Sequence, residues 1–278
     1  MRLRLQGAAV LSLGILAFSV LSAFGWGETA DRLVTNKAVD TLPEEMQPFF
    51  NASRQFLVQH VTAADELKIT GTTGHRADFI QLDHYGQFPF SALPREYNAA
   101  IAKFNRRTLE QFGLLPWQIG VYSKKLTDAF REHDWGQVRL SASILAHYVN
   151  AAHDPFNTTI NMDGKLSLQP GVNERFSVGL VDRYQLFFFV KPNEAALIHD
   201  PTDHAFEDCL TSHSLLETVL LADRRAHAGL TEYKEDYYDR FYSLAGAILV
   251  RQLSDASTDV GSYWMTAWIN AGRPALPQ

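Results

Sequence analysis

Cysteine is nearly absent from the sequence. Cys209 is the single thiol among 278 residues, so no disulfide can form within the chain. If the protein works in an oxidising compartment, its stability must therefore come from packing. No Gly-x-Ser-x-Gly element points to a serine hydrolase, and no Gly-rich loop is present to hold a phosphate group. An excess of positive charge is also lacking: the formal net charge is −6, which gives no electrostatic footprint for nucleic acid.

A long, uncharged and largely apolar run is present near the N-terminus, from Leu5 to Phe24. Two arginines precede it, and small residues occupy the −3 and −1 positions of a cut after Gly25. These features predict a signal peptide over residues 1–25 and a secreted or periplasmic mature chain that begins at Trp26. No cysteine lies near the cut, which argues against a lipid-modified N-terminus. The alternative is an uncleaved membrane anchor formed by the same run, which is about long enough to span a bilayer. No membrane span is expected in the mature chain.

Residues 26–278 show no internal repeat, no low-complexity tract and no Gly/Ser linker, and most long segments have helical periodicity. The sequence therefore predicts a single all-α, multi-helix domain. Long loops are expected at about 68–95 and 154–175, and the run Phe187–Val190 is a possible strand without an obvious partner. The expected helices are one or two between Leu33 and Phe49, ended by Pro43 and Pro48, one from Phe56 toward Leu67, and others at 97–112, 122–130, 138–152, 205–227, 233–253 and 261–271.

The run from His147 to Asn157 has the frame of a metal-binding helix with most of the ligands replaced. A zinc site takes three or four ligands from His, Cys, Asp and Glu. His147 is such a residue, but the positions four and ten residues later hold Ala151 and Asn157.

Further elements place this run in a wider series. In chain order they are Trp26-Gly27, Ala64-Asp65, Asp78-Phe-Ile-Gln81, Leu115-Pro-Trp117, His147–Asn157, Asn161-Met-Asp-Gly164, Gly171–Ser177 and Trp264–Pro274. In this order they resemble the zinc-dependent phospholipase C and single-strand-specific nuclease superfamily. The resemblance covers nearly all of the predicted mature chain and implies the all-α fold of that superfamily.

The resemblance also implies a centre for three zinc ions, and it gives each ligand position a residue in this chain. Three positions match the ligands of the superfamily: Trp26, Asp65 and His147. Two others hold carboxylates that can still donate oxygen: Asp31 and Asp78. Four hold residues that cannot replace the lost ligands: Ala151, Asn157, Asn173 and Ser177.

Phosphodiester hydrolysis in this superfamily uses several metal ions, so these replacements predict a catalytically impaired protein that acts as a binding or structural module. Its ligand would be a small molecule or phosphoester in the cleft. The alternative is an active metal-dependent phosphodiesterase or phosphatase with a reduced, oxygen-rich metal site.

If Asp31, Asp65 and Asp78 lie together in this centre, their carboxylates need positive charge nearby. We expect no metal cofactor, with the α-ammonium of Trp26, aided by Arg32 or Arg76, as the counter-charge. A single zinc, calcium, magnesium or manganese ion among the remaining donors is the alternative.

The other histidines receive structural interpretations. His153 lies on a different helical face from His147, so we expect it to support a ligand or to pack in the interior. His60 is expected to pack on its helix, and His199 and His204, which flank Pro201, are expected in a loop. His75 is an alternative to Asp78 if the match is shifted by three residues.

Overall fold

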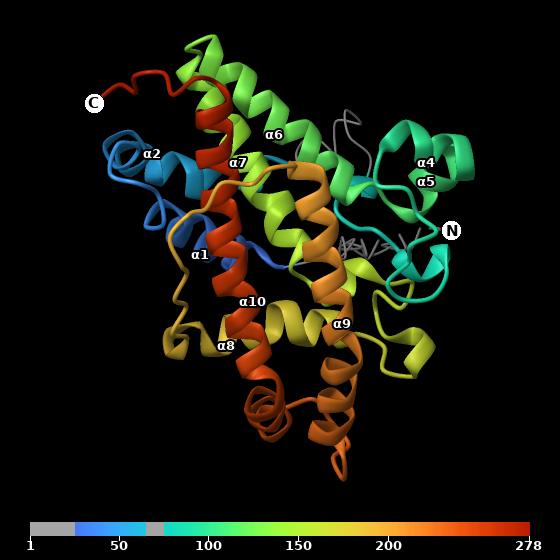
Figure 1. The fold of residues 1–278 in the computed structure, drawn as a ribbon. Coiled ribbons are helices and arrows are strands. Elements are labelled where there is room, and N and C mark those ends of the chain that lie inside the picture. The colour runs from blue at the N-terminus through green and yellow to red at the C-terminus, as the bar shows by residue number, and fades with distance from the viewer. Residues whose placement is uncertain (1–25, 65–74) are drawn as a thin grey trace, which may run out of the picture.

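The computed structural model describes residues 26–64 and 75–278, and within these ranges it contains helices and no strand (Figure 1). The prediction of an all-α fold is therefore confirmed. The predicted signal peptide, residues 1–25, and the candidate ligand Asp65 lie outside the described residues.

The α-helices follow one another along the whole described chain. They are α1 (Glu28–Val39), α2 (Gln47–His60), α4 (Tyr97–Phe104), α5 (Arg106–Phe112), α6 (Leu115–Arg131), α7 (Trp135–Ala152), α8 (Leu180–Tyr184), α9 (Pro201–His227) and α10 (Glu235–Asn270). Shorter helical turns are η1 (His75–Ala77), η2 (Leu82–Tyr85), η3 (Pro155–Thr158), η4 (Lys165–Ser167), the π-helical η5 (Glu174–Gly179) and η6 (Gln185–Phe187).

Helix α7 forms the centre of the fold. Every residue from Ser141 to Ala152 is buried, as expected for a helix that is covered on all sides. Helices α1, α2, α6, α9 and α10 all contact it. Asp134 caps its N-terminus by accepting a hydrogen bond from the Gln137 backbone N–H at 3.0 Å. A polar side chain in the second half of α7, such as that of His147, must therefore find its partners inside the protein.

The possible strand Phe187–Val190 does not form: Phe187 ends the helical turn η6, and an extended segment without strand structure begins at Phe188. It continues along α10 toward the start of α9, and its backbone bonds to side chains of that helix. Four N–H groups donate to hydroxyl oxygens at every fourth position of α10: Lys191 to Ser254 at 3.1 Å, Asn193 to Thr258 at 3.0 Å, Ala196 to Ser262 at 2.9 Å and Ile198 to Thr266 at 2.9 Å. Residues four apart share one face of a helix, so this row satisfies the extended backbone without a sheet.

Several predicted helix limits were wrong for identifiable reasons. The predicted helices 233–253 and 261–271 are one helix, α10, which continues through Gly261. A Cβ atom at Gly261 would lie 1.9 Å from Thr41 Oγ1, so this glycine permits close packing of α10 beside the end of α1. Pro48 lies in the first turn of α2 and does not end a helix. The predicted helix 97–112 is divided at Asn105, whose φ is 60°.

Helix α9 begins earlier than predicted, and this corrects the placement of His204. Asp200 caps the helix, its carboxylate accepting N–H bonds from Thr202 and Asp203, and Pro201 occupies the first turn. His204 is therefore a helical residue, whereas His199 lies in the preceding loop as predicted.

In the ranges 26–64 and 75–278, none of the helices has the length and apolar character needed to cross a membrane.

Candidate functional site

Three of the predicted site residues converge in the interior, and they come from three distant segments. His147 on α7 directs Nδ1 to Asp31 Oδ2 of α1 at 2.9 Å. Its Nε2 lies 3.4 Å from Oδ1 of Asp78, which follows η1. All three residues are almost fully buried, with exposed fractions of 6% for His147 and 3% for each aspartate. We call this group the His147 centre.

The His147 centre is held by the helices that carry it. Asn150, one turn after His147, donates its amide N–H to the second oxygen of Asp31 at 2.6 Å. Asp31 thus bonds to two side chains on one face of α7. The segment after Asp78 is anchored by Ile80, whose backbone N–H donates to the Asn157 carbonyl at 2.8 Å.

The two carboxylates change the charge of the histidine. Burial alone would lower the pKa of His147, but the charge of Asp31 and hydrogen bonds to Asp31 and Asp78 outweigh burial and raise the pKa to about 10. This raised pKa favours the protonated imidazole, which contributes counter-charge to the two carboxylates.

The expected counter-charge, the α-ammonium of Trp26 aided by Arg32 or Arg76, stays a prediction, because that amine would exist only after cleavage before Trp26. Arg32 lies on the exposed side of α1 and pairs with Glu28. Trp26 is buried, and its ring packs against Phe176 at 5.8 Å between centroids. Phe176 precedes Ser177, so the predicted start of the mature chain contacts one of the segments that the resemblance assigns to the zinc centre. Arg76 is exposed.

The four replaced positions are occupied by side chains that bond within the frame or make no metal-ligand contact. Asn157 donates its amide N–H to the carbonyl of Ala151 at 3.0 Å. Ser177 donates its hydroxyl to Asp154 Oδ2 at 2.7 Å. Asn173 is buried immediately before η5. The Asn157 amide N–H and the Ser177 hydroxyl therefore have partners within the protein, whereas Oδ1 of Asn157 and of Asn173 is buried without a hydrogen-bond partner among the described residues.

The Ser177 bond stabilises a buried acid. Burial raises the pKa of Asp154 to about 6, although hydrogen bonds from Ser177 and from the Phe156 backbone N–H oppose this shift. Both bonds come from the segments His147–Asn157 and Gly171–Ser177, which the resemblance assigns to the zinc centre.

Among the described residues, the His147 centre has fewer donors than the three-zinc centre that the resemblance implies. A catalytic zinc ion usually takes three ligands from the protein. On the Nε2 side of the His147 ring, the described residues offer two donors, Nε2 itself and the Asp78 carboxylate. Asp31 lies on the other side of the ring, where it bonds to His147 Nδ1 and to Asn150. A third donor would have to be Asp65, outside the described residues, or the Trp26 amine, which cleavage alone would create.

A second group of ionisable side chains was not predicted from the sequence. His153 was interpreted as an interior or supporting residue, and it is indeed buried, with Nε2 3.0 Å from Asp259 Oδ2. His204 also pairs with Asp259, at 3.1 Å, and lies 3.7 Å from Asp208. The pair His204 and Asp208 has helical i, i+4 spacing, which the sequence could have revealed if Pro201 had been recognised as the start of a helix.

Comparisons with known proteins show a similarity in fold. No protein family model matches the chain, and no curated protein matches it significantly. Among solved structures, the alpha-toxin of Clostridium perfringens isolated from avian strain SWCP is similar, with a TM-score of 0.53 and 13% sequence identity. The match covers 86% of this chain and 63% of the toxin chain, so this chain spans less than two thirds of the toxin's length. Over most of its own length, the chain has a fold similar to that of the alpha-toxin.

Proposed function

We propose that this protein is an exported member of the phospholipase C and nuclease type of fold whose metal centre has become a structural ion cluster. In this proposal the protein does not hydrolyse phosphodiesters efficiently and acts as a binding or structural module. The fold similarity to the alpha-toxin supports the scaffold, and the signal-like residues 1–25 support export.

One observation carries the proposal: side chains at replaced ligand positions are integrated into the frame. Asn157 bonds to the Ala151 carbonyl, and Ser177 bonds to Asp154. An amide and a hydroxyl in these positions do not generate the metal-bound hydroxide that multinuclear phosphodiesterases use. Their hydrogen bonds give these residues a stabilising role in place of the ligands that the resemblance implies.

The charge of the His147 centre supports the same proposal. A ligand histidine must be neutral at the nitrogen that binds the metal. Here both ring nitrogens of His147 lie near carboxylates, which favours the protonated ring. In this proposal His147 contributes the cation that faces Asp31 and Asp78, and the centre works without a metal cofactor.

A pocket lined in part by residues that follow Asp78 and Asn157 in the chain supports a binding role. The two segments that carry Asp78 and Asn157 continue into the lining of a pocket of about 530 Å³. Its walls include Asp83, Thr159 and His213, together with the exposed side chains of Phe88 and Ile160. This volume lies within the usual range for small-ligand sites, and a lining that combines apolar side chains with the carboxylates of Asp83 and Glu217 suits an amphipathic small molecule without negative charge.

The proposal is tested by hydrolysis of a bis-aryl phosphodiester by the purified protein with added zinc, calcium or manganese. The expected result is a rate no higher than that of the His147→Ala variant. A metal-dependent rate that disappears in His147→Ala would instead establish the alternative, a phosphodiesterase with a reduced metal site. Binding of the same compound is measured in parallel, because the proposal allows binding without turnover.

A further inference from the structure

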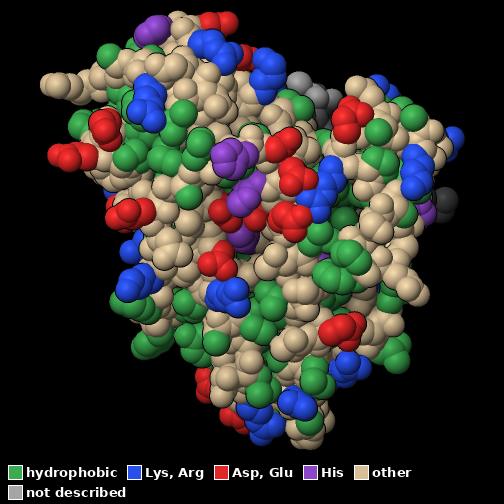
Figure 2. Space-filling view, viewed as in Figure 1, with side chains coloured by type: hydrophobic (Ala, Val, Ile, Leu, Met, Phe, Trp, Pro, Cys, Tyr) green, Lys and Arg blue, Asp and Glu red, His purple; other side chains and the backbone are tan. Residues whose placement is uncertain are grey.

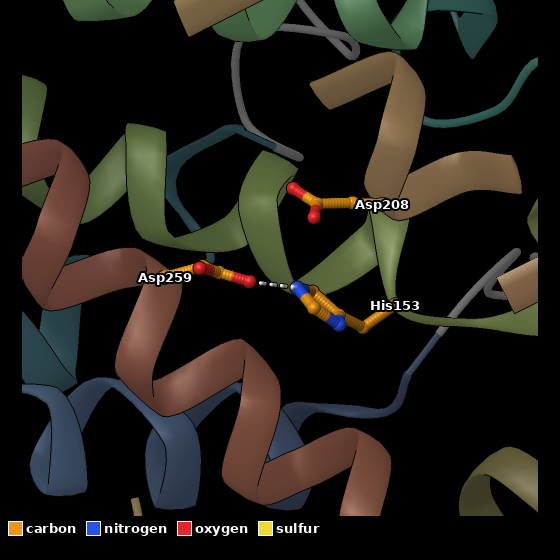
Figure 3. A group of neighbouring side chains, drawn as sticks. All are labelled: His153, Asp208 and Asp259. Carbon is orange, nitrogen blue, oxygen red and sulfur yellow. Dashed lines mark ion pairs between the residues drawn. The ribbon is translucent and has the colours of Figure 1, made fainter. Parts of the chain in front are cut away.

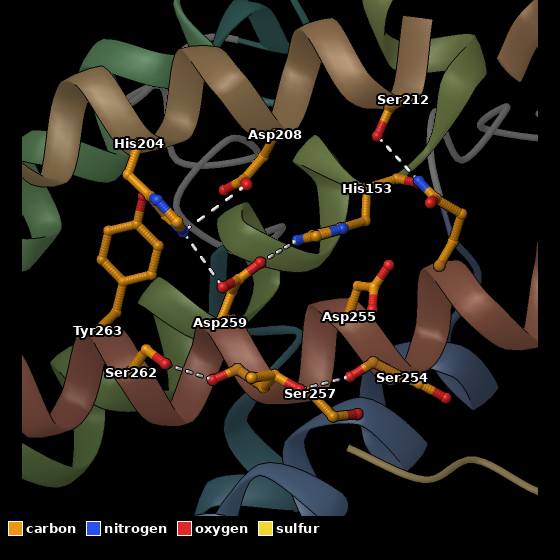
Figure 4. A network of polar contacts seen from close by, with 12 residues as sticks. His153, His204, Asp208, Ser212, Ser254, Asp255, Ser257, Asp259, Ser262 and Tyr263 are labelled. Carbon is orange, nitrogen blue, oxygen red and sulfur yellow. Dashed lines mark hydrogen bonds and ion pairs between the residues drawn. The ribbon is translucent and has the colours of Figure 1, made fainter. Parts of the chain in front are cut away.

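Four ionisable side chains from three helices meet away from the His147 centre, where α9 runs beside α10. His204 and Asp208 lie one turn apart on α9, Asp259 lies on α10, and His153 caps the C-terminus of α7 (Figure 4). Figure 2 shows histidine and acidic side chains gathered on the face that α9 and α10 present to solvent. We call these four residues the α9–α10 cluster.

The distances in the α9–α10 cluster are those of groups that can share one ion. Asp259 lies between the two imidazoles, 3.0 Å from His153 Nε2 and 3.1 Å from His204 Nε2. His204 Nε2 lies 3.7 Å from Asp208 Oδ1. Donor atoms around a tetrahedral zinc ion with bonds of about 2.0–2.2 Å are separated by roughly 3.3–3.6 Å. Donor atoms of His153, Asp208 and Asp259 all lie within 4.8 Å of one another, so small side-chain rotations would bring them to this spacing (Figure 3).

A buried oxygen in the cluster has no hydrogen bond. Asp208 is 8% exposed, and its Oδ2 atom has no hydrogen-bond partner among the described residues. Leaving a buried carboxylate oxygen without a partner is costly. A cation beside Asp208 would remove the penalty.

The surroundings of the cluster add negative charge. The negative charge of Asp255, one turn before Asp259, contributes to the raised pKa of His153, and that of Glu207 contributes to the raised pKa of His204. Glu207 also forms an ion pair with Arg95, so the positive charge of Arg95 lies beside a carboxylate that is not one of the four residues of the cluster. A divalent cation bound here would take the place of the protons on the two imidazoles as the counter-charge of these carboxylates.

The supports of the cluster hold its donors in place. Gln252 on α10 donates to the His153 carbonyl at 2.7 Å and to the Ser212 hydroxyl at 2.9 Å, which ties the end of α7 to both long helices. The ring of Tyr263 packs edge-on against His204 at 5.8 Å between centroids. The His204 side chain is 35% exposed, which gives an ion a route from solvent.

From this geometry we propose that the α9–α10 cluster is a binding site for one divalent transition-metal ion, with zinc as the ion that its two imidazoles and two carboxylates suit best. Imidazole nitrogen with carboxylate oxygen is a usual zinc ligand set, whereas calcium and magnesium prefer oxygen alone. The site shares no residue with the His147 centre, and the inference goes beyond the proposed function and does not depend on it. Its role would be to fasten α7, α9 and α10 together.

The test is calorimetric titration of untagged, chelator-treated protein with zinc, repeated with cobalt to record the visible spectrum of the bound ion. We expect one equivalent of zinc to be lost, or its affinity to fall at least about tenfold, in both His204→Gln and Asp208→Asn, since even the loss of an outer partner weakens metal binding by that much. His204 is partly exposed and Asp208→Asn keeps the side-chain shape, so both variants are expected to fold, and circular dichroism verifies this.

Two control variants make the test specific. His199→Gln removes an exposed neighbouring histidine, and His147→Gln disrupts the other centre; both are expected to leave the zinc equivalent of the α9–α10 cluster intact. The proposal is wrong if the wild-type protein shows no saturable zinc binding, or if His204→Gln and Asp208→Asn bind zinc as tightly as the wild type. Zinc binding that is lost only in His147→Gln would contradict both this proposal and the metal-free His147 centre.

Discussion

Among single residues, His147 is the most important for the proposed function, as a buried cation between two carboxylates. Its two ring nitrogens lie 2.9 Å from Asp31 and 3.4 Å from Asp78. Removing one member of a buried ion cluster leaves the others uncompensated, which typically costs several kcal/mol. A histidine that had merely survived from a metal site would not be needed for folding in this way.

We predict that His147→Gln lowers the free energy of unfolding by about 3 kcal/mol near neutral pH. The folded-state pKa of about 10 lies above the ordinary value of 6.5, so protonation favours the folded state. The stabilisation by His147 is complete below pH 6.5 and is lost as the pH rises through 10. Urea unfolding at a series of pH values measures it: the difference between wild type and variant should shrink toward alkaline pH. His199→Gln, at an exposed position, should behave like the wild type, and a pH-independent difference for His147→Gln would count against a charged imidazole.

Ser177 gives a second prediction at this scale. Ser177→Ala removes a hydrogen bond to the buried Asp154, and bonds to charged groups contribute about 2 kcal/mol. The folded-state pKa of Asp154, about 6, already lies above the ordinary 3.8, so this acid favours the folded state at low pH and loses that contribution as the pH rises through 6. Loss of the hydroxyl should raise the pKa further, so the variant should be destabilised more above pH 6 than below it. Chemical unfolding on both sides of that pH measures the effect, with the exposed Ser214→Ala as the control; equal losses at both pH values would refute it.

At the scale of elements, the row of hydroxyl groups on α10 determines how the chain between α8 and α9 is held. We predict that Thr266→Val destabilises the protein by about 1–2 kcal/mol, because the buried Ile198 N–H loses its acceptor while side-chain shape is kept. Thr258→Val is the matched variant, since the Asn193 N–H that it leaves is exposed to water, and its effect should be clearly smaller. Thermal or urea unfolding of both variants decides the matter, and equal effects would mean that the hydroxyl row does not hold this segment.

Close packing of α10 beside the end of α1 gives another prediction for an element. Gly261→Ala should destabilise the protein by about 1–3 kcal/mol, because its Cβ would lie 1.9 Å from Thr41 Oγ1 and force the two elements apart. The matched control is Gly136→Ala in the first turn of α7, where an added Cβ meets only the side chain of Asp134, at 3.3 Å. Unfolding measurements should show a loss for the first variant and no comparable loss for the second.

Hydrophobic periodicity in the sequence predicted where most helices lie, but it did not predict where they begin and end. Pro48 and Pro201 interrupt a hydrophobic pattern in the sequence, yet each lies in the first turn of a helix, where its missing N–H is harmless. In the sequence, Gly261 suggested the boundary between two helices. In the structure it permits close packing against Thr41, which lies more than two hundred residues away in the chain. Such contacts between distant segments carry no signal in local sequence spacing.

At the scale of the whole molecule, the two ion clusters differ in how far the sequence could predict them. The convergence of Asp31, Asp78 and His147 followed from the resemblance, since the residues lie on three separate segments. The sequence did not reveal that His147 itself would supply the counter-charge, because that depends on burial and on distances. Predicting the α9–α10 cluster would have required knowing how three helices pack. Within it, only the pair His204 and Asp208 has a spacing that indicates proximity from the sequence.

The most direct test of the central claim is a nitrogen NMR titration of the histidine side chains in the purified protein, with and without zinc. The His147 signals are assigned by their loss in His147→Gln. The account predicts that both His147 ring nitrogens stay protonated through neutral pH and do not respond to zinc, while signals of His153 and His204 shift. If zinc removes a proton from His147 and shifts its nitrogen resonance, the centre is still a metal site and the account is wrong.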